Sequence, residues 1–176
     1  GLIGLGQVAS HYENILRDNS LSDFVEISLG VDPIDEVRKK WQGRVKKYLM
    51  EDISHIDPNE LDLALVLTPS GLHEEDSFRL LEKGINVLCE KPIGLNIEKV
   101  RDNIKLAKRK NIAYGGVFQN RFNKPVLLIK KLIDQGVFGK IISSSVRLQW
   151  CRLHDYYNDG WHGKWALDGG VINQQA

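Results

Sequence analysis

The feature that most constrains the fold is a repeated alternation of short apolar runs with segments of helical periodicity. The apolar runs occupy residues 2–5, 24–31, 45–49, 61–67, 85–90 and 112–118. Residues 63–67 and 87–89 are continuously apolar, which is typical of strands buried on both faces. Strand–helix alternation of this kind predicts an α/β fold over residues 1–119, with a doubly wound parallel sheet between two layers of helices.

The first run leads into a glycine-rich turn, Gly4-Leu5-Gly6-Gln7-Val8-Ala9, and then into an amphipathic helix. Gly4 permits the tight turn, Gly6 lets the backbone approach a pyrophosphate without a Cβ atom in the way, and Ala9 allows close packing of helix and strand. N–H groups at the helix start, at Gln7 and Val8, point toward the phosphates. We therefore predict that Gly4, Gly6, Gln7 and Val8 bind a dinucleotide, with a purely structural turn as the alternative.

An acidic residue follows the second predicted strand at a matching distance. Asp32 comes 23 residues after Ala9, close to the spacing at which a carboxylate meets the ribose hydroxyls of the adenosine half. Its structural alternative is to cap a helix whose first residue is Pro33 and whose apolar face carries Trp41. No arginine follows Asp32 directly to receive a 2′-phosphate, which favours NAD over NADP. Together, the turn and Asp32 predict a Rossmann domain that binds NAD.

Two later strand ends carry polar groups that belong in the same crevice. The turn Thr68-Pro69-Ser70-Gly71 follows the fourth strand, and His73 opens the next helix. Glu90-Lys91-Pro92 follows the fifth strand, and Pro92 is expected to stop it rigidly, with a cis peptide bond as one means. Because parallel strands present their carboxyl ends at one edge, we expect these residues to line the ligand site. A capping or surface role remains the alternative for His73.

Lys91 is the predicted catalytic residue. It stands where a nicotinamide ring placed by the glycine turn would lie, and an alcohol must lose its hydroxyl proton as hydride leaves its carbon. A lysine with a lowered pKa, or one linked to a histidine, can take that proton. The alternative is an exposed surface lysine. The adjacent Glu90 makes a purely structural role for this residue pair less favourable, because a buried strand end is packed more easily without charged side chains.

Composition narrows the class of partner. The chain has 176 residues, is 42% hydrophobic, and carries a net charge of +1 with acids and bases interspersed. We therefore expect small-molecule partners, with no nucleic-acid or membrane surface, no transmembrane helix and no metal site. Cys89 and Cys151, each in a predicted strand, are interpreted as reduced thiols of a cytoplasmic protein. Since the first strand lacks a beginning, we expect the chain to be a piece of a longer protein.

Residues 120–176 are predicted to begin a second domain. A helix is expected from Pro125 to Gln135, closed by Gly136. Residues 141–152 then alternate between two faces, which is typical of a half-buried strand in an antiparallel sheet. The next segment, 156–165, is crowded with aromatic and polar groups and lacks periodicity, so it is expected to be a functional loop.

Three motifs resemble those of one family. Gly4-x-Gly6-x-x-Ala9, Thr68-Pro69-Ser70-x-x-His73 and Cys89-Glu90-Lys91-Pro92 look like the Gfo/Idh/MocA oxidoreductases, and the Glu-Lys-Pro triplet is the most specific mark. The resemblance covers the whole chain. It implies a Rossmann domain followed by the beginning of an α+β open-sheet substrate domain, a tightly bound nicotinamide, and Lys91 near the reacting carbon. The cofactor-binding residues would then also include Thr68, Pro69, Ser70, His73, Glu90, Lys91 and Gln119.

Further segments look most like the UDP-N-acetylglucosaminuronate 3-dehydrogenases of bacterial surface-polysaccharide synthesis. They are Gln119-Asn120-Arg121-Phe122-Asn123, Gln149-Trp150-Cys151-Arg152, Tyr156-Tyr157, Trp161-His162-Gly163-Lys164-Trp165 and Asp168-Gly169-Gly170. This resemblance implies oxidation at C3 of a UDP-linked sugar in a pocket formed by Lys91, Arg121, Arg152, Tyr156, Trp161 and Trp165. Core packing is the alternative for the tryptophans.

The chain departs from the family pattern at its carboxyl end. Family members usually continue with an Asp-x-Gly-x-His-x-x-Asp-like segment, which here begins as Gln174-Gln175-Ala176 with glutamine in place of the first aspartate. We expect the histidine partner of Lys91, most of the second sheet and a dimer or tetramer interface to lie beyond Ala176. Exposed apolar surface is therefore expected at this end. The rival functions are an inositol or free-sugar dehydrogenase of the same family and a non-catalytic NAD-binding regulatory module.

Overall fold

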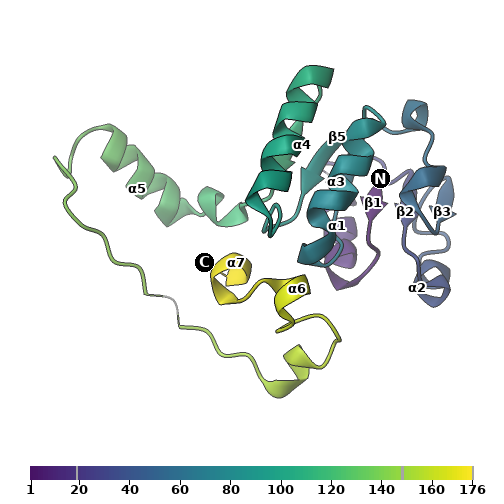
Figure 1. The fold of residues 1–176 in the computed structure, drawn as a ribbon. Helices are drawn as coiled ribbons and strands as arrows, with labels where there is room; N and C mark the ends of the chain where they lie inside the picture. The colour runs from purple at the N-terminus through teal and green to yellow at the C-terminus, as the bar shows by residue number, and fades with distance from the viewer. Residues whose placement is uncertain (19, 148, 176) are drawn as a thin grey trace.

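A computed structural model describes residues 1–18, 20–147 and 149–175 and is centred on a six-stranded parallel sheet (Figure 1). The strands are β1 (Leu2–Ile3), β2 (Leu29–Val31), β3 (Tyr48–Met50), β4 (Leu63–Val66), β5 (Asn86–Cys89) and β6 (Tyr114–Gly116). Their order in the sheet is β3-β2-β1-β4-β5-β6, so the chain reverses its direction of travel between β1 and β4. This is the strand order of a doubly wound dinucleotide-binding fold, and the predicted α/β class is confirmed.

Helices connect the strands and continue beyond the sheet. Between strands lie α1 (Gln7–Leu16), α2 (Asp35–Lys40), α3 (His73–Glu82) and α4 (Ile97–Lys110); after the sheet come α5 (Lys124–Asp134), α6 (Trp165–Asp168) and α7 (Val171–Gln175). Short 3₁₀ turns are η1 (Ile53–His55), η2 (Pro58–Glu60), η3 (Ser70–Leu72), η4 (Gln119–Phe122) and η5 (His154–Tyr157). Within the described ranges, no helix has both the length and the apolar character needed to cross a membrane.

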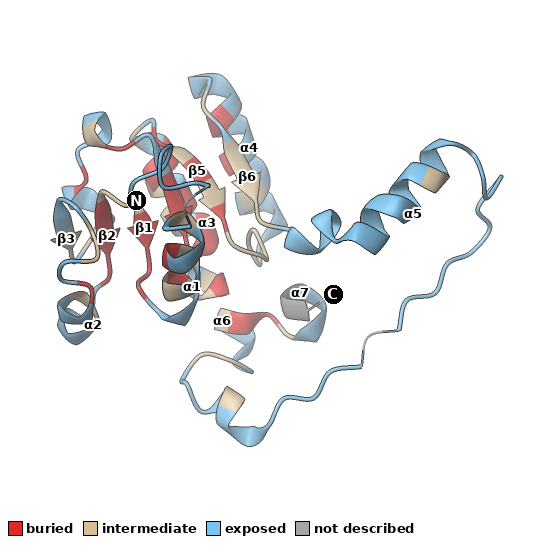
Figure 2. Cartoon of the chain, turned by 180° about the vertical axis from the view of Figure 1, so that it is seen from behind, coloured by how far each residue is buried: buried red, intermediate tan, exposed pale blue. Residues whose placement is uncertain are grey.

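Two apolar clusters bury the two faces of the sheet. Neighbouring residues of a strand point to opposite faces, so Ile3 joins one cluster and Leu2 the other. The Ile3 cluster receives Leu81 of α3, whereas the Leu2 cluster receives Ala9 of α1 and Trp41, which follows α2. The helices therefore form one layer on each face, and Figure 2 shows the buried residues concentrated between these layers.

Two helix ends are fixed by local capping chemistry. The side chain of Asn96 accepts hydrogen bonds from the N–H groups of Glu98 and Lys99 at the start of α4. Gly84 has φ of +84° just after α3, in the left-handed region that glycine adopts without steric cost. These local signals determine where helices begin and end.

The predicted second strand is too long. Only Leu29–Val31 forms a strand, although the carbonyls of Ile27 and Ser28 also accept hydrogen bonds from the N–H groups of Lys46 and Lys47. The start of the run 24–31 is held in a turn, in which the N–H of Phe24 donates to the carbonyl of Leu21. β1 covers the first two residues of its predicted run, β4, β5 and β6 cover the central parts of theirs, and β3 is shifted toward Met50. The core pairing is therefore shorter than apolar run length suggests.

The predicted start of the following helix is also wrong. α2 begins at Asp35 with Ile34 in the N-cap position, so Asp32 is not the cap and Pro33 is not the first helical residue. The carboxylate of Asp32 instead accepts the N–H of Ile34 at 2.9 Å in a turn ahead of the helix. Asp32 is thus held at the end of β2, where its charge can face a ligand.

The predicted strand over 141–152 is not formed in its described parts, 141–147 and 149–152; residue 148 lies outside the described residues. Ile142 and Val146 are each 92% exposed, and Cys151 is exposed rather than inside a strand. A strand needs a neighbour for its N–H and C=O groups, and the sheet of the described chain offers none here. Figure 2 shows this segment, called the arm below, as exposed along its described length. Helix α5, which precedes it, has no buried residue. The apolar surface expected at this end is therefore present.

Two leucines offer a matched test of where the core lies. Leu81 of α3 is 0% exposed, whereas Leu128 of α5 is 56% exposed. Leu81→Ala leaves a cavity, so we expect it to lower the free energy of unfolding by about 2–5 kcal/mol. Leu128→Ala is expected to change that free energy by no more than about 0.5 kcal/mol. Urea denaturation followed by circular dichroism measures both, and equal effects would contradict this placement of the core.

Candidate functional site

The carboxyl ends of the strands bring four predicted site segments to one edge of the sheet. The glycine turn follows β1, Asp32 follows β2, the Thr68 turn follows β4 and Glu90 follows β5. β1 and β4 are neighbours, and the chain leaves them in opposite directions across the sheet. Open α/β sheets bind ligands at this position, outside the carboxyl ends of such a strand pair.

The glycine turn has the geometry of an anion-binding loop. Gly4 has φ of +87°, and a Cβ atom added there would lie 2.9 Å from the backbone nitrogen of Thr68. Gly6 has φ of −73° and is exposed, and a Cβ atom there would meet nothing within 4 Å. α1 has no side-chain cap and no acidic residue in its first turn. The exposed start of α1 at Gln7 and Val8 therefore suits a pyrophosphate.

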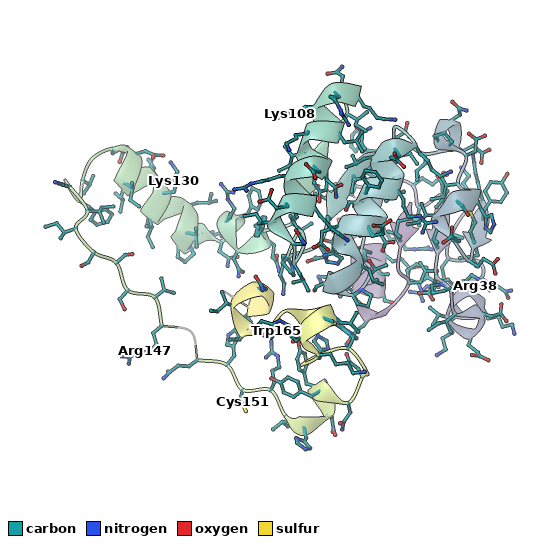
Figure 3. The ribbon with its side chains drawn as sticks, in the orientation of Figure 1. Arg38, Lys108, Lys130, Arg147, Cys151 and Trp165 are labelled. Atoms are coloured by element: carbon teal, nitrogen blue, oxygen red, sulfur yellow. The ribbon has the colours of Figure 1, made fainter. Side chains whose placement is uncertain are left out.

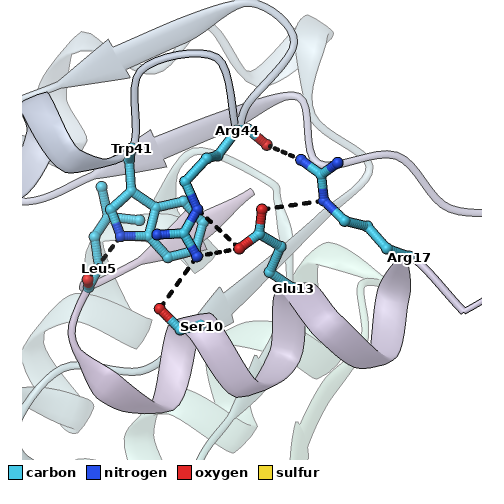
Figure 4. A network of polar contacts seen from close by, with 6 residues as sticks. All are labelled: Leu5, Ser10, Glu13, Arg17, Trp41 and Arg44. Atoms are coloured by element: carbon cyan, nitrogen blue, oxygen red, sulfur yellow. Dashed lines mark hydrogen bonds and ion pairs between the residues drawn. The ribbon is translucent and has the colours of Figure 1, made fainter.

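The backbone of Leu5, between the two glycines, is held from both sides, and Figure 4 shows the bond from Trp41. Its N–H donates to Oδ2 of Asp32 at 3.0 Å, and its carbonyl accepts from Nε1 of buried Trp41 at 2.9 Å. The guanidinium of Arg44 lies 4.0 Å from the centroid of the Trp41 ring. The turn is thus fixed by β2 and by the end of α2 within the protein itself.

A buried carboxylate, Glu13, ties α1 to the segment before β3 (Figure 4). It accepts hydrogen bonds from Arg44, whose guanidinium also reaches Ser10, and pairs with Arg17 at 3.0 Å. The hydrogen bonds from Arg44 hold the pKa of Glu13 below its usual range, against the raising effect of burial. A surface hollow beside this network is lined by Arg17, Arg44 and Lys46 and lies at the amino ends of β2 and β3, away from the ligand edge.

Asp32 organises the part of the edge that follows β2. One carboxylate oxygen accepts the N–H of Leu5 and the other the N–H of Ile34, and each oxygen can accept a second hydrogen bond from a ribose hydroxyl. Arg38 donates to the backbone carbonyl of Asp32 at 2.6 Å and pairs with Asp35 at 3.2 Å. Figure 3 shows Arg38 at the α2 end of the molecule, well separated from Trp165. An arginine therefore reaches this strand end, although none follows Asp32 directly.

The turn after β4 is joined to the segment after β5 through His73. Its Nδ1 lies 2.6 Å from the carbonyl oxygen of Pro92, and its Nε2 lies 2.7 Å from that of Thr68. Thr68 also donates its hydroxyl hydrogen to Asp76 at 2.8 Å, and burial raises the pKa of Asp76. His73 and Ser70 are buried, whereas Thr68 and Pro69 remain partly exposed.

Glu90 joins the end of β5 to α1. Its Oε1 accepts the hydroxyl of Tyr12 at 2.8 Å, and its Oε2 accepts the N–H of Lys91 at 2.8 Å. Burial, followed by the hydrogen bond to Glu90, raises the pKa of Tyr12 far above its usual value. The peptide bond between Lys91 and Pro92 is cis, as the sequence suggested.

Lys91 is partly buried among charges from three segments. Burial lowers the pKa of its ammonium group, the carboxylates of Glu90 and Asp168 oppose that change, and the guanidinium of Arg152 adds to it. A lysine whose pKa is lowered by burial exchanges its proton more readily than a surface lysine.

The carboxyl-terminal segment brings one predicted substrate residue, Arg152, within electrostatic range of Lys91. The guanidinium of Arg152 lies 5.2 Å from the centroid of the Tyr156 ring and acts electrostatically on Lys91. Trp161 stacks on His162 with ring centroids 3.6 Å apart. Neither Trp161 nor Trp165 is buried, so core packing does not account for them within the described chain. Figure 3 shows Trp165 beside the Rossmann domain, where α6 packs on η3.

Two predicted residues lie apart from this group. Gln119 and Arg121 belong to η4, which follows β6, and both are exposed. Their roles stay predictions.

The sequence analysis named Asp168 within a resembling segment but gave it no role; it is 6% exposed at the end of α6. Its Oδ2 accepts the N–H of Gly163 at 2.9 Å, while its Oδ1 is buried and, among the described residues, has no hydrogen-bond partner. Its charge also acts on Lys91. The available signal was an acid directly before Gly169 and Gly170, whose positive φ values end the helix.

Comparison with known proteins agrees with this geometry. The model of an oxidoreductase family with an NAD-binding Rossmann fold, Gfo/Idh/MocA, matches residues 1–116. An uncharacterized oxidoreductase of Streptococcus pneumoniae serotype 4 is 32% identical over 145 residues, covering 81% of this chain and 38% of that protein. The scyllo-inositol 2-dehydrogenase (NADP(+)) IolW of Bacillus subtilis is 28% identical over 172 residues, covering 98% of this chain and 47% of that protein.

Among solved structures, the WlbA dehydrogenase from Bordetella pertussis, in complex with NADH and UDP-GlcNAcA, is similar to the chain with a TM-score of 0.92. The sequence identity is 29%, and the match covers 100% of this chain and 53% of that one. The chain thus spans between 38% and 53% of the length of these three proteins.

The effect of the Asp168 carboxylate on the pKa of Lys91 can be tested with Asp168→Asn. Because the Asp168 carboxylate stabilises the ammonium form of Lys91, removing its charge should lower the pKa of Lys91 further. The shift can be followed by NMR titration of ¹³C-methylated lysines, with the Lys91 signal assigned through Lys91→Arg. Asp155→Asn, at an exposed position in η5, serves as the control. An unchanged or raised pKa in Asp168→Asn would contradict the arrangement.

Proposed function

The chain belongs to the Gfo/Idh/MocA oxidoreductase family, whose NAD-binding Rossmann fold matches residues 1–116, and we propose that the protein is a nicotinamide-dependent sugar dehydrogenase. The observation that carries the proposal is the meeting of the glycine turn and Lys91 at one edge of the sheet. A phosphate-binding loop and a partly buried proton-transfer group at the same edge serve hydride transfer to or from a sugar carbon.

The residues present fit a dinucleotide along this edge. In the proposal, Gly4, Gly6, Gln7 and Val8 hold the pyrophosphate at the start of α1, where nothing lies within 4 Å of the Gly6 Cβ position. Asp32 receives the adenosine ribose. The nicotinamide half is contacted by the later strand ends and η4, through Thr68, Pro69, Ser70, Glu90, Lys91 and Gln119. His73, which is 2% exposed, supports this site through its contacts with Thr68 and Pro92.

Lys91 handles the proton in this reaction. Oxidation of a secondary alcohol transfers hydride from carbon to the bound nicotinamide and releases the hydroxyl proton, leaving a ketone. Neutral Lys91 accepts that proton, and burial together with Arg152 favours the neutral form. Glu90 and Asp168 favour the ammonium form, which returns the proton in the reverse direction.

The proposed substrate is a UDP-linked N-acetyl amino-sugar uronate, oxidised at its C3 hydroxyl for the synthesis of bacterial surface polysaccharide such as lipopolysaccharide. Support comes from the likeness to the WlbA dehydrogenase, whose structure contains UDP-GlcNAcA. Charge adds support, since such a substrate carries a diphosphate and a carboxylate, and Arg152 supplies an exposed cation close to Lys91. Arg121, Tyr156, Trp161 and Trp165 would complete the pocket.

An inositol or free-sugar dehydrogenase is the second candidate. The similarity to IolW over 98% of this chain favours it. A neutral polyol, however, leaves the Arg152 cation without a complementary charge. The two candidates therefore differ in whether Arg152 contributes to substrate affinity.

Gly6→Ala tests the cofactor site without disturbing the fold. Its φ of −73° suits any residue, and the new Cβ meets nothing within 4 Å, so we expect unchanged stability. A bound pyrophosphate needs that space, so NADH affinity should fall by about tenfold or more, or about 1.4 kcal/mol.

NADH fluorescence titration and thermal melting measure these two effects. Gly115→Ala, whose Cβ meets Leu88 only at an ordinary 3.5 Å, is the control. Wild-type affinity in Gly6→Ala would refute the placement of the pyrophosphate.

The proposed reaction can be tested by substrate comparison together with Lys91→Ala. We expect NADH to form with UDP-GlcNAcA in preference to myo- or scyllo-inositol, as followed by absorbance. Loss of the proton acceptor should reduce turnover by about 10²- to 10⁴-fold. NADH affinity should change little, because Lys91 is not a phosphate ligand in the proposal. Lys99→Ala, on exposed α4 surface, is the control.

Preference for an inositol would replace the substrate proposal with the second candidate. Normal turnover in Lys91→Ala, or loss of cofactor binding with normal turnover per bound cofactor, would reject Lys91 as the proton-transfer group.

A further inference from the structure

His73 makes two short contacts that together restrict its protonation state. It is the first residue of α3 and is 2% exposed. Its Nδ1 lies 2.6 Å from the carbonyl oxygen of Pro92, and its Nε2 lies 2.7 Å from that of Thr68. Both partners are backbone carbonyl oxygens, which accept hydrogen bonds and never donate them.

A neutral imidazole can satisfy only one of these carbonyls. It carries one N–H, so its bare nitrogen would face the lone pairs of the other oxygen at hydrogen-bond distance. Buried polar groups in such a repulsive contact are costly, since no water replaces the missing hydrogen bond. The imidazolium ion donates from both nitrogens and satisfies both oxygens.

The surroundings supply the negative charge that an imidazolium needs. α3 itself contributes Glu74, Glu75 and Asp76, and the hydroxyl of Thr68 donates to Asp76 at 2.8 Å. The segment after β5 contributes Glu90 and Lys91, and α6, which packs on η3, ends in Asp168. Among these groups, Asp76 interacts electrostatically with the His73 ring.

We propose that His73 is a positioning residue whose imidazolium ties the turn after β4 to the segment after β5 and so holds Lys91 in place. Pro92, one of its two partners, is covalently joined to Lys91, so a bond to that carbonyl restrains the backbone from which the lysine side chain extends. The link to the reaction rests on the proposed function of Lys91, whereas the charged clamp itself does not.

The clamp gives His73 a role different from direct contact with the cofactor, which the sequence suggested. Both ring nitrogens are committed to backbone carbonyls, so neither is offered to a ligand in this structure. A side chain with a single donor could keep only one of the two bonds and would free one side of the clamp.

The protonation state can be read directly on the wild-type chain. Long-range ¹H–¹⁵N correlation spectra of ¹⁵N-labelled protein distinguish imidazolium from the neutral tautomers, and His73→Gln assigns the signals. We expect both His73 nitrogens to be protonated at neutral pH, with His11 and His154, both exposed, serving as internal controls. A neutral tautomer of His73 at neutral pH would overturn the proposal.

The effect on Lys91 is tested by kinetics on the proposed reaction. His73→Gln, which can donate to only one carbonyl at a time, should lower kcat by about 10- to 100-fold, because small displacements of a proton-transfer group are costly. KM for NAD should change less. An unaltered kcat, or equal changes in kcat and KM, would overturn the positioning role. An imidazolium signal in a protein that oxidises none of the substrates would leave the clamp standing and reject the proposed function instead.

Discussion

The site depends on the double restraint of Leu5. Its N–H is held by the carboxylate of Asp32, and its carbonyl by the indole of Trp41, which is itself buried beneath Arg44. These bonds join the first two strands to the glycine turn, so the start of α1 is held in position before any ligand binds. Preorganisation of this kind avoids the cost of ordering a loop when an anion binds. A substitution at Trp41 would therefore loosen the glycine turn, although Trp41 is not part of that turn.

The opposite end of the edge is organised by buried polar groups rather than by apolar packing. Glu90 bonds to Tyr12 of α1, and His73 spans the carbonyls of Thr68 and Pro92. Buried groups of this type stabilise a structure only when their hydrogen bonds are complete, which makes their geometry strict. Lys91 lies between Glu90 and Pro92 in this network. Burial lowers the pKa of its ammonium group, and the carboxylates of Glu90 and Asp168 raise it. The same contacts that hold the lysine also adjust how readily it gives up its proton.

Local chemistry in the sequence predicted the glycine turn, the order of strands and helices, and the meeting of Asp32, Thr68 and Lys91 at one edge. These succeeded because glycine conformation, capping and strand burial act over a few residues. The prediction of a strand over 141–152 failed because alternation does not supply the neighbour that a strand requires. The role of Asp168 was not predicted because it depends on Lys91, far away in the chain. The contact of Arg38 was not predicted because its side chain folds back on Asp32.

The sequence by itself determined that this chain forms a doubly wound α/β domain with a dinucleotide loop, since periodicity and turn chemistry are written in consecutive residues. Only the tertiary structure decided which polar atoms meet. It gave His73 two carbonyl partners, set Asp168 near Lys91, and left the arm after α5 unpaired. The physical reason is that hydrogen bonds and charge interactions depend on distances between atoms from separate strands, and those distances exist only once the sheet has assembled.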